Sequence, residues 1–208
     1  MENLNASLED LNPFHLEVLR EVGNIGVGNA VTSLAQMLSK KVNMDVPEAG
    51  ILELQDVITL IGGEEDVIVC VEQLIEGDTP AILLFILNEE SAMCLTDLLL
   101  GRERGSTTSI GEMEESLLKE VGNILSGSIL NALSEMTGLV FVPSVPAFAH
   151  DMMGAVLSSA LIEGGYYSDK VLVVETRFFE SATEIKGYFF ILPQKEVVEK
   201  ILSALGVG

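Results

Sequence analysis

The sequence predicts an α+β fold, in which two copies of one unit join about a pseudo-two-fold axis and helices cover an antiparallel sheet. Three observations predict it. A motif near the start of the chain recurs 99 residues later. Each copy shows the same order of helical and extended segments. Each copy alone would have a small core and an exposed sheet edge, and continuing one sheet through both copies removes that edge.

The repeat can be seen in the sequence itself. Residues 19–25 read LREVGNI and residues 118–124 read LKEVGNI, so the offset between their glutamates is 120 − 21 = 99. The same offset relates further matching pairs, namely Gly28 with Gly127 and Val46-Pro47 with Val145-Pro146. Near the end of each copy the offset becomes 105, because Leu100-Gly101 matches Leu205-Gly206. Internal self-similarity over this length indicates duplication of a structural unit.

We therefore expect residues 1–208 to form a single domain of two repeats, at about 12–102 and 112–207. The short linker between them is rich in Gly, Ser and Thr, as a connection should be. Each repeat should contain, in order, the motif helix; an extended segment (42–46 or 139–142); a second helix (52–61 or 151–162); two strands (67–73 and 81–87, or 171–176 and 187–192); and a final helix (89–100 or 194–205).

Local signals justify these elements. Apolar residues in the motif segments recur at helical spacing. Prolines end the extended segments. Gly77-Asp78 and the 180–186 stretch are predicted to connect the strands as hairpins. Gly101 and Gly206 stand where a glycine ends a helix.

Composition excludes several classes of protein. Asp and Glu number 32 against 11 Lys and Arg, a formal net charge of −21, which disfavours binding to nucleic acid or anionic membranes. A hydrophobic content of 48% excludes a disordered acidic tail. The longest apolar run, Ala81–Leu87, is too short to span a membrane.

The polar N-terminus is unlike a secretory signal. Cys70 and Cys94 are predicted to be buried free thiols. We expect a cytoplasmic protein.

The repeated motif carries the candidate chemistry. Glu21 and Asn24 stand three residues apart, as do Glu120 and Asn123. On a helix this spacing places both side chains on one face, so each pair forms a small polar site on a rigid support. The alternative is that each pair belongs to an ordinary solvated helix face, preserved in both copies because the residues around it share their packing.

Glycines inside the motif helices are unexpected, because each costs about 1 kcal/mol relative to alanine. Gly23, Gly26 and Gly122 therefore indicate close approach by another helix or by the backbone of a partner. We interpret them as marking a docking surface beside the Glu and Asn side chains.

Other signatures are absent from the sequence. It contains no phosphate-binding P-loop motif, and its Gly26-Val27-Gly28 segment lacks a preceding strand. Neither His15 nor His150 has neighbours at a convincing metal-ligand spacing.

On these motifs the chain resembles the family of chemotaxis phosphatases that includes CheC, CheX and FliY. The resemblance rests on the segment from Glu21 to Gly28, its repeat from Glu120 to Gly127, and Val145-Pro146 followed by residues 151–155. The family pattern is Asp or Ser, three residues, Glu, two residues, Asn. Ser116 fits its first position in the second copy, whereas Glu17 departs from it in the first.

The resemblance implies a phosphatase that dephosphorylates the phosphorylated response regulator CheY. Asn24 and Asn123 would orient the attacking water, and Glu21 and Glu120 would dock on a lysine of the regulator. The regulator would supply Mg²⁺, so the protein would need no metal or cofactor of its own. Asp151 would contact a further partner, the deamidase CheD, and the internal repeat implies a monomer. The alternative is a non-catalytic adaptor that binds CheD or phosphorylated CheY.

Overall fold

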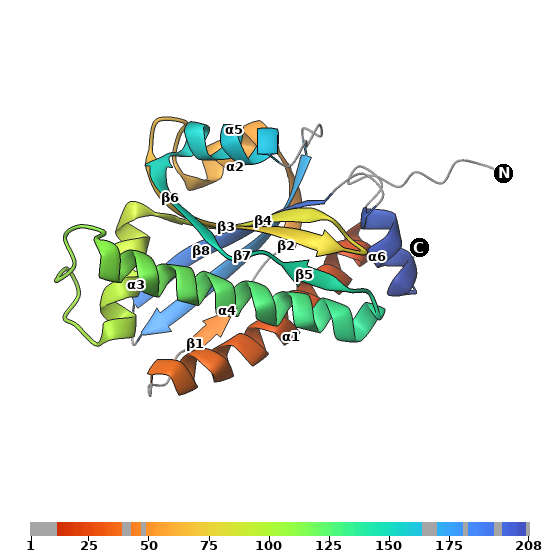
Figure 1. Ribbon diagram of the computed structural model, residues 1–208, viewed down its shortest axis with the longest axis horizontal. Coiled ribbons are helices and arrows are strands. Elements are labelled where there is room, and N and C mark those ends of the chain that lie inside the picture. Colours follow the sequence, from red (N-terminus) through yellow and green to blue (C-terminus); the bar gives the residue numbers. More distant parts are fainter. Residues whose placement is uncertain are drawn as a thin grey trace.

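A single curled antiparallel sheet forms the centre of the computed structural model, which describes residues 12–38, 43–46, 49–163, 170–180, 183–193 and 197–206 (Figure 1). Within these residues the sheet has eight strands, in the order β1-β7-β8-β4-β3-β5, with β2 also pairing with β7 and β6 with β3. The first half contains α1 (Pro13–Leu38), β1 (Asn43–Asp45), β2 (Ala49–Glu53), α2 (Leu54–Ile61), β3 (Val67–Gly77), β4 (Ala81–Asn88) and α3 (Glu89–Leu100). The second contains α4 (Glu112–Thr137), β5 (Phe141–Pro143), β6 (Ala147–Met152), α5 (Met153–Glu163), β7 (Lys170–Glu180), β8 (Thr183–Pro193) and α6 (Val197–Ala204).

The two halves exchange their short strands. β1 and β2 of the first half pair with β7 of the second, and β5 and β6 of the second half pair with β3 of the first. The hairpins meet at β4 and β8, where Phe85 lies directly opposite Phe189 and their stacked rings have centroids 4.8 Å apart. These two residues are related by an offset of 189 − 85 = 104. The predicted α+β fold with an internal duplication is confirmed.

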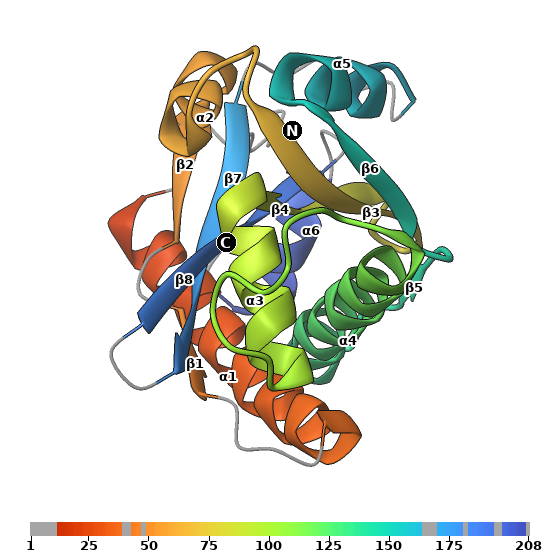
Figure 2. The same ribbon diagram turned by 90° about the vertical axis from the view of Figure 1, so that its left-hand side faces the viewer.

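Alternating residues of the strands face two different helix layers. Val69 and Val71 belong to a core shared with α1, α3 and α4, whereas Ile68 and Cys70 belong to a second core beneath α2 and α5. Figure 2 shows the two layers on opposite faces of the sheet. Because side chains alternate along a strand, the offset of 104 keeps equivalent residues of β4 and β8 on the same face, whereas an offset of 105 would reverse them. None of the described helices is long and apolar enough to cross a membrane.

The structure corrects some of the predicted elements. β2 and β6 were not predicted, and β6 takes Asp151 and Met152 from the start of the predicted helix at 151–162. Residues 183–186 were predicted to lie in a hairpin connection but belong to β8. Residues 194–196, the predicted start of the last helix, lie outside the described residues. Gly101 and Gly206 follow their helices with left-handed φ angles of 67° and 73°, as predicted.

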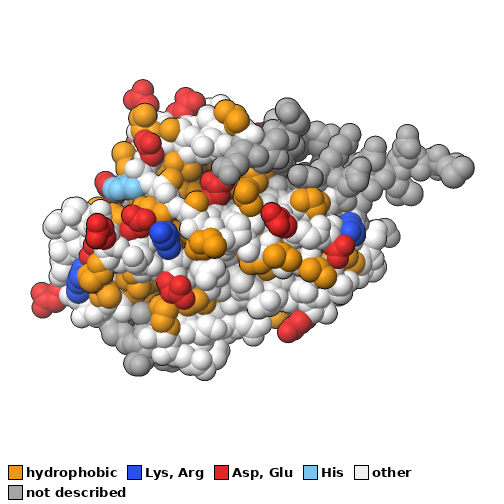
Figure 3. All heavy atoms as spheres, in the orientation of Figure 1, with side chains coloured by type: hydrophobic (Ala, Val, Ile, Leu, Met, Phe, Trp, Pro, Cys, Tyr) orange, Lys and Arg blue, Asp and Glu red, His pale blue; other side chains and the backbone are white. Residues whose placement is uncertain are grey.

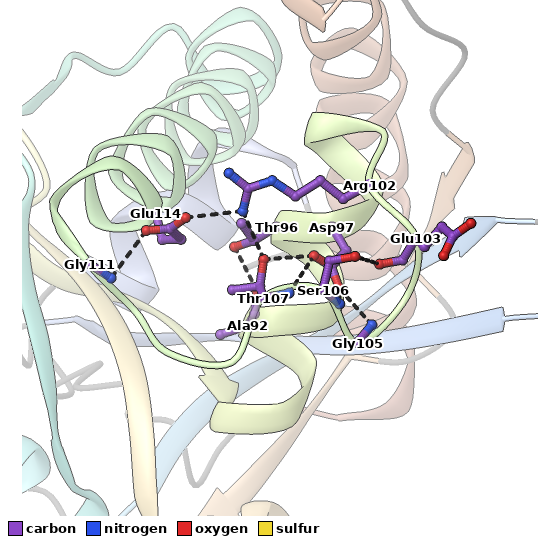
Figure 4. Close-up of polar contacts among 10 residues, drawn as sticks. All are labelled: Ala92, Thr96, Asp97, Arg102, Glu103, Gly105, Ser106, Thr107, Gly111 and Glu114. Carbon is purple, nitrogen blue, oxygen red and sulfur yellow. Dashed lines mark hydrogen bonds and ion pairs between the residues drawn. The ribbon is translucent and has the colours of Figure 1, made fainter.

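Asp97 of α3 holds the segment that connects the two halves (Figure 4). Its side chain is 2% exposed and accepts hydrogen bonds from the backbone N–H groups of Gly105, Ser106 and Thr107, and from the Thr107 hydroxyl at 2.6 Å. Burial by itself would raise the pKa of Asp97, but these hydrogen bonds outweigh it and hold the pKa below its ordinary value. The carboxylate therefore stays ionised and fixes the path of the chain from α3 toward α4.

A second polar contact reinforces the same connection. Arg102 donates hydrogen bonds to the Thr107 hydroxyl at 3.0 Å and to Glu114 of α4 at 3.1 Å. Glu114 also accepts a hydrogen bond from the backbone N–H of Gly111, which precedes the helix. The connection is thus tied to the start of the helix that carries the second motif.

Candidate functional site

The two Glu–Asn pairs occupy equivalent positions on the longest helices, α1 and α4. Glu21 and Glu120 are exposed, and Asn24 and Asn123 are half-buried. In each pair the carboxylate is therefore exposed to solvent, and the amide next to it is half-buried. Among the described residues, no hydrogen bond or ion pair joins one pair to the other.

The glycines of the motif face the interior of the molecule. A Cβ atom on Gly26 would lie 2.7 Å from the Cα of Ile129 on α4, and one on Gly122 would lie 2.7 Å from Cγ1 of Val71 on β3. Gly23 and Gly122 are buried over the sheet, on the side of each helix away from the exposed glutamate. Our interpretation of these glycines as a docking surface is therefore wrong, because they let α1 pack on α4 and α4 pack on the sheet.

We expect Gly26→Ala to destabilise the protein by at least about 1 kcal/mol, since the backbone of Ile129 blocks the added methyl group. Gly28→Ala is the matched control. A Cβ at Gly28 meets nothing within 4 Å, so that variant should be more stable by about 0.5–1 kcal/mol through helix propensity alone. Urea unfolding monitored by circular dichroism would measure both. A rise in stability of equal size in both variants would contradict the close packing of α1 on α4.

Asn123 is held from below by a buried glutamine. Gln73 of β3 is 1% exposed, and its Nε2 donates hydrogen bonds to Oδ1 of Asn123 at 3.2 Å and to the carbonyl oxygen of Ser144 at 2.9 Å. The Ser144 hydroxyl in turn accepts a hydrogen bond from the backbone N–H of Leu74. This network joins the second Glu–Asn pair to the sheet and to the connection between β5 and β6.

The first site has no such network. Val71 lies beneath Gly122 and Val174 beneath Gly23, so β3 and β7 correspond with an offset of 174 − 71 = 103, and Thr176 stands where Gln73 does. Thr176 is fully buried, and its hydroxyl donates to the carbonyl oxygen of Gly187 at 2.9 Å. In the described part of the chain, the Asn24 amide has no hydrogen-bond partner.

The cations next to the motifs are paired locally. Glu17, at the position where the family has Asp or Ser, forms an ion pair with Arg20 one helical turn away. On α4, Lys119 pairs with Glu115 at 3.3 Å, and Ser116 is exposed. The glutamates of the two motifs are in neither pair, so their carboxylates remain available to a cation of a partner.

Gly28 and Gly127 lie one turn beyond the asparagines. A Cβ at either position would meet nothing within 4 Å, so neither glycine is required by packing inside the molecule. Their part in the motif that supports the Glu–Asn pairs stays a prediction.

Asp151 lies apart from both Glu–Asn pairs. It is exposed near the end of β6, opposite Ile68 of β3, rather than at the start of a helix as predicted. Its neighbour His150 contacts Glu89 of α3 at 2.8 Å. Within the described residues, no group of three or more His, Cys, Asp and Glu side chains could hold a metal ion.

Sequence reasoning missed Gln73 and Ser144. Gln73 belongs to the first half of the chain, and the pairing of β5 and β6 with β3 brings it to Asn123 and Ser144 of the second half. One signal was present: by the alternation of side chains, Gln73 falls on the same face of β3 as Val71 and Ile75, where a buried amide needs a partner.

Comparison with known proteins agrees with the repeated motif. The model of the CheC-like family matches residues 14–51 and 113–150, two segments separated by 113 − 14 = 99 residues. A protein of Bacillus subtilis (strain 168) named CheY-P phosphatase CheC is 36% identical over 197 residues, covering 93% of this chain and 94% of that protein. The chain belongs to the CheC-like family. A second B. subtilis protein, named flagellar motor switch phosphatase FliY, is 25% identical over 128 residues, which cover 61% of this chain and 33% of that protein.

Solved structures share the fold of this CheC-like protein. The crystal structure of Thermotoga maritima FliY superposes with a TM-score of 0.76 at 21% identity, covering 95% of this chain and 98% of that one. The FliM middle domain of H. pylori gives a TM-score of 0.69 at 12% identity, covering 93% and 99% of the two chains. The fold therefore tolerates wide divergence in sequence, and function has to be argued from the sites.

Proposed function

We propose that this protein is a phosphatase that hydrolyses the aspartyl phosphate of phosphorylated CheY. Membership of the CheC-like family and 36% identity to a protein named CheY-P phosphatase CheC support the reaction. The observation that carries the proposal is the placement of each Glu–Asn pair on a long, rigid helix, with the glutamate exposed and the asparagine half-buried beside it.

The proposed chemistry relies on positioning. The oxygen of a water molecule forms a bond to phosphorus as the bond from phosphorus to the aspartyl oxygen breaks. The products are a free aspartate and inorganic phosphate, and the proton of the water passes to the phosphate or to solvent. An asparagine amide both donates and accepts hydrogen bonds, so Asn24 or Asn123 can hold that water in line with the phosphorus.

The glutamates would provide docking. Glu21 or Glu120 would form an ion pair with the active-site lysine of the regulator, drawing that lysine away from the phosphoryl group. Phosphoryl transfer needs cationic stabilisation of the phosphate oxygens, and we propose that the Mg²⁺ of the regulator supplies it. The protein would then contribute no metal or cofactor of its own.

The surface charge imposes a condition on docking. The chain carries a net charge of −21, and Figure 3 shows acidic side chains spread over one face of the molecule, with hydrophobic ones between them. A phosphorylated regulator would be repelled at long range, but salt screens such repulsion beyond about 8–10 Å. Contacts at the Glu–Asn pairs would therefore determine binding.

The test is the decay of radiolabelled phosphate on CheY with and without the purified protein. A phosphatase shortens the lifetime of the label in proportion to the protein added, and it turns over more than once. The alternative function, a non-catalytic adaptor, predicts binding of phosphorylated CheY with no change in lifetime. That result would overturn the proposal.

We further propose that the protein binds CheD through the surface around Asp151 and that it acts as a monomer. Asp151 is exposed, and Met152 beside it is 47% exposed, so the two form a mixed polar and apolar contact away from the Glu–Asn pairs. Asp151→Ala should weaken binding of CheD, measured by calorimetry, while the decay assay with CheY is unchanged. Unaltered CheD affinity would remove Asp151 from the interface.

A further inference from the structure

A buried amide distinguishes the second site from the first. The Nε2 atom of Gln73 has two hydrogens, and both are used: one bonds to Oδ1 of Asn123 and the other to the carbonyl oxygen of Ser144. A backbone carbonyl can only accept a hydrogen bond, so the Gln73 nitrogen, not its oxygen, must face Ser144. This orientation in turn requires Asn123 to turn its oxygen toward Gln73.

The glutamine is poorly suited to a purely structural role. Its Oε1 is buried and has no hydrogen-bond partner, which is destabilising in a protein interior. A leucine at this place would fill similar space in the apolar core without that penalty. An amide that is unfavourable for packing but completes the hydrogen bonds of a candidate site residue is typical of a functional position.

We propose that Gln73 is a positioning residue for the second site, which presets the Asn123 amide for water orientation and makes this site the faster of the two. The inference rests on the proposed function. With Oδ1 anchored, the Nδ2 group of Asn123 and the second lone pair of Oδ1 remain to contact a water molecule. The amide does not have to be ordered when the attacking water is aligned in the transition state, so the gain appears in kcat.

The first site lacks this advantage. Thr176, at the position equivalent to Gln73, bonds to the Gly187 carbonyl, and among the described residues nothing holds the Asn24 amide. Ordering a free side chain in the transition state lowers kcat, and for one amide we expect a difference of about fivefold between the sites. Each half of the chain thus supplies one asparagine, and only the first half supplies a glutamine beneath the asparagine of the other.

The experiment isolates each site before altering Gln73. Asn24→Ala leaves the second site active and Asn123→Ala leaves the first, and Gln73→Leu is added to each. We expect Gln73→Leu to lower kcat for CheY-P about fivefold in the Asn24→Ala protein, with KM nearly unchanged. In the Asn123→Ala protein the second site is already disabled, so the same substitution should leave the remaining rate as it was. Thr176→Val, a buried substitution at the equivalent strand position, controls for loosening of the sheet.

Two further measurements keep the outcomes distinct. Gln73→Thr places the residue of the first site under Asn123, which tests the proposal should Gln73→Leu fold poorly, and the same loss of kcat is expected. Side-chain amide NMR should show a fixed Asn123 in the wild type that becomes mobile, like Asn24, in either variant.

An equal loss of kcat at both sites, or no loss of kcat at the second site, would overturn the role of Gln73. A wild-type protein that leaves CheY-P untouched would refute the proposed function, and NMR would then decide the positioning role alone.

Discussion

Replacing Asn24 and Asn123 together by alanine is expected to return the decay of phosphorylated CheY to its unassisted rate. Each asparagine is the one amide of its Glu–Asn pair, and alanine can neither donate nor accept a hydrogen bond. Loss of a group that positions a reactant costs about 100-fold in rate, so the double variant should show no measurable acceleration. Each single variant should keep the activity of the other helix.

The helices offer matched controls for this experiment. Asn29 of α1 and Asn131 of α4 are exposed asparagines outside the Glu–Asn pairs. Asn29→Ala combined with Asn131→Ala removes the same number of amides from the same helices and should keep the wild-type rate. If the double variant at Asn24 and Asn123 still accelerates decay as the wild type does, the proposed chemistry is wrong.

Replacing Asp97 by asparagine is expected to destabilise the whole protein by about 2–3 kcal/mol. Asparagine keeps one acceptor oxygen, so its NH₂ group would face either the N–H of Thr107 or the N–H groups of Gly105 and Ser106, and those donors would lose their acceptor. For a chain of 208 residues, this corresponds to a melting temperature lower by about 6–10 °C. Differential scanning calorimetry would measure the shift.

Acid should abolish the advantage of the wild type over Asp97→Asn. The pKa of Asp97 is lowered in the folded state, so its contribution to stability is complete above the ordinary carboxyl value of 3.8. The contribution disappears as the pH falls below that value and through the folded-state pKa. Glu90→Gln is the control, because Glu90 and Arg104 form an exposed pair at 3.6 Å and the substitution should change stability by less than about 0.5 kcal/mol. A constant difference between wild type and Asp97→Asn down to pH 2 would contradict the ionised state of Asp97.

Local patterns in the sequence predicted the parts of this structure that depend on neighbours along the chain. The offset of 99 residues identified α1 and α4 as equivalent helices, and the three-residue spacing placed each Glu beside its Asn. Helical periodicity and the glycines that end helices depend only on residues a few positions apart, so both can be recognised in a single sequence.

Contacts between the halves could not be predicted in this way. β2 has five residues and β6 has six, and what makes them strands is a partner in the other half of the molecule. The hydrogen bond from Gln73 to Asn123 joins residues 50 positions apart. The glycines were wrongly interpreted as a docking surface for the same reason. Ile129 packs against Gly26 and Val71 packs against Gly122, and both are distant from those glycines in sequence.

Because the two halves exchange strands, the site on each half depends on the other half. Each motif helix lies on the hairpin of the opposite half: Gly122 packs over Val71 of β3, and Gly23 packs over Val174 of β7. Deleting either repeat would therefore remove one Glu–Asn pair and also the strand that supports the helix of the other pair. A single substitution can instead change one site and leave the other intact, and the contrast between Gln73 and Thr176 is a difference that affects one site alone.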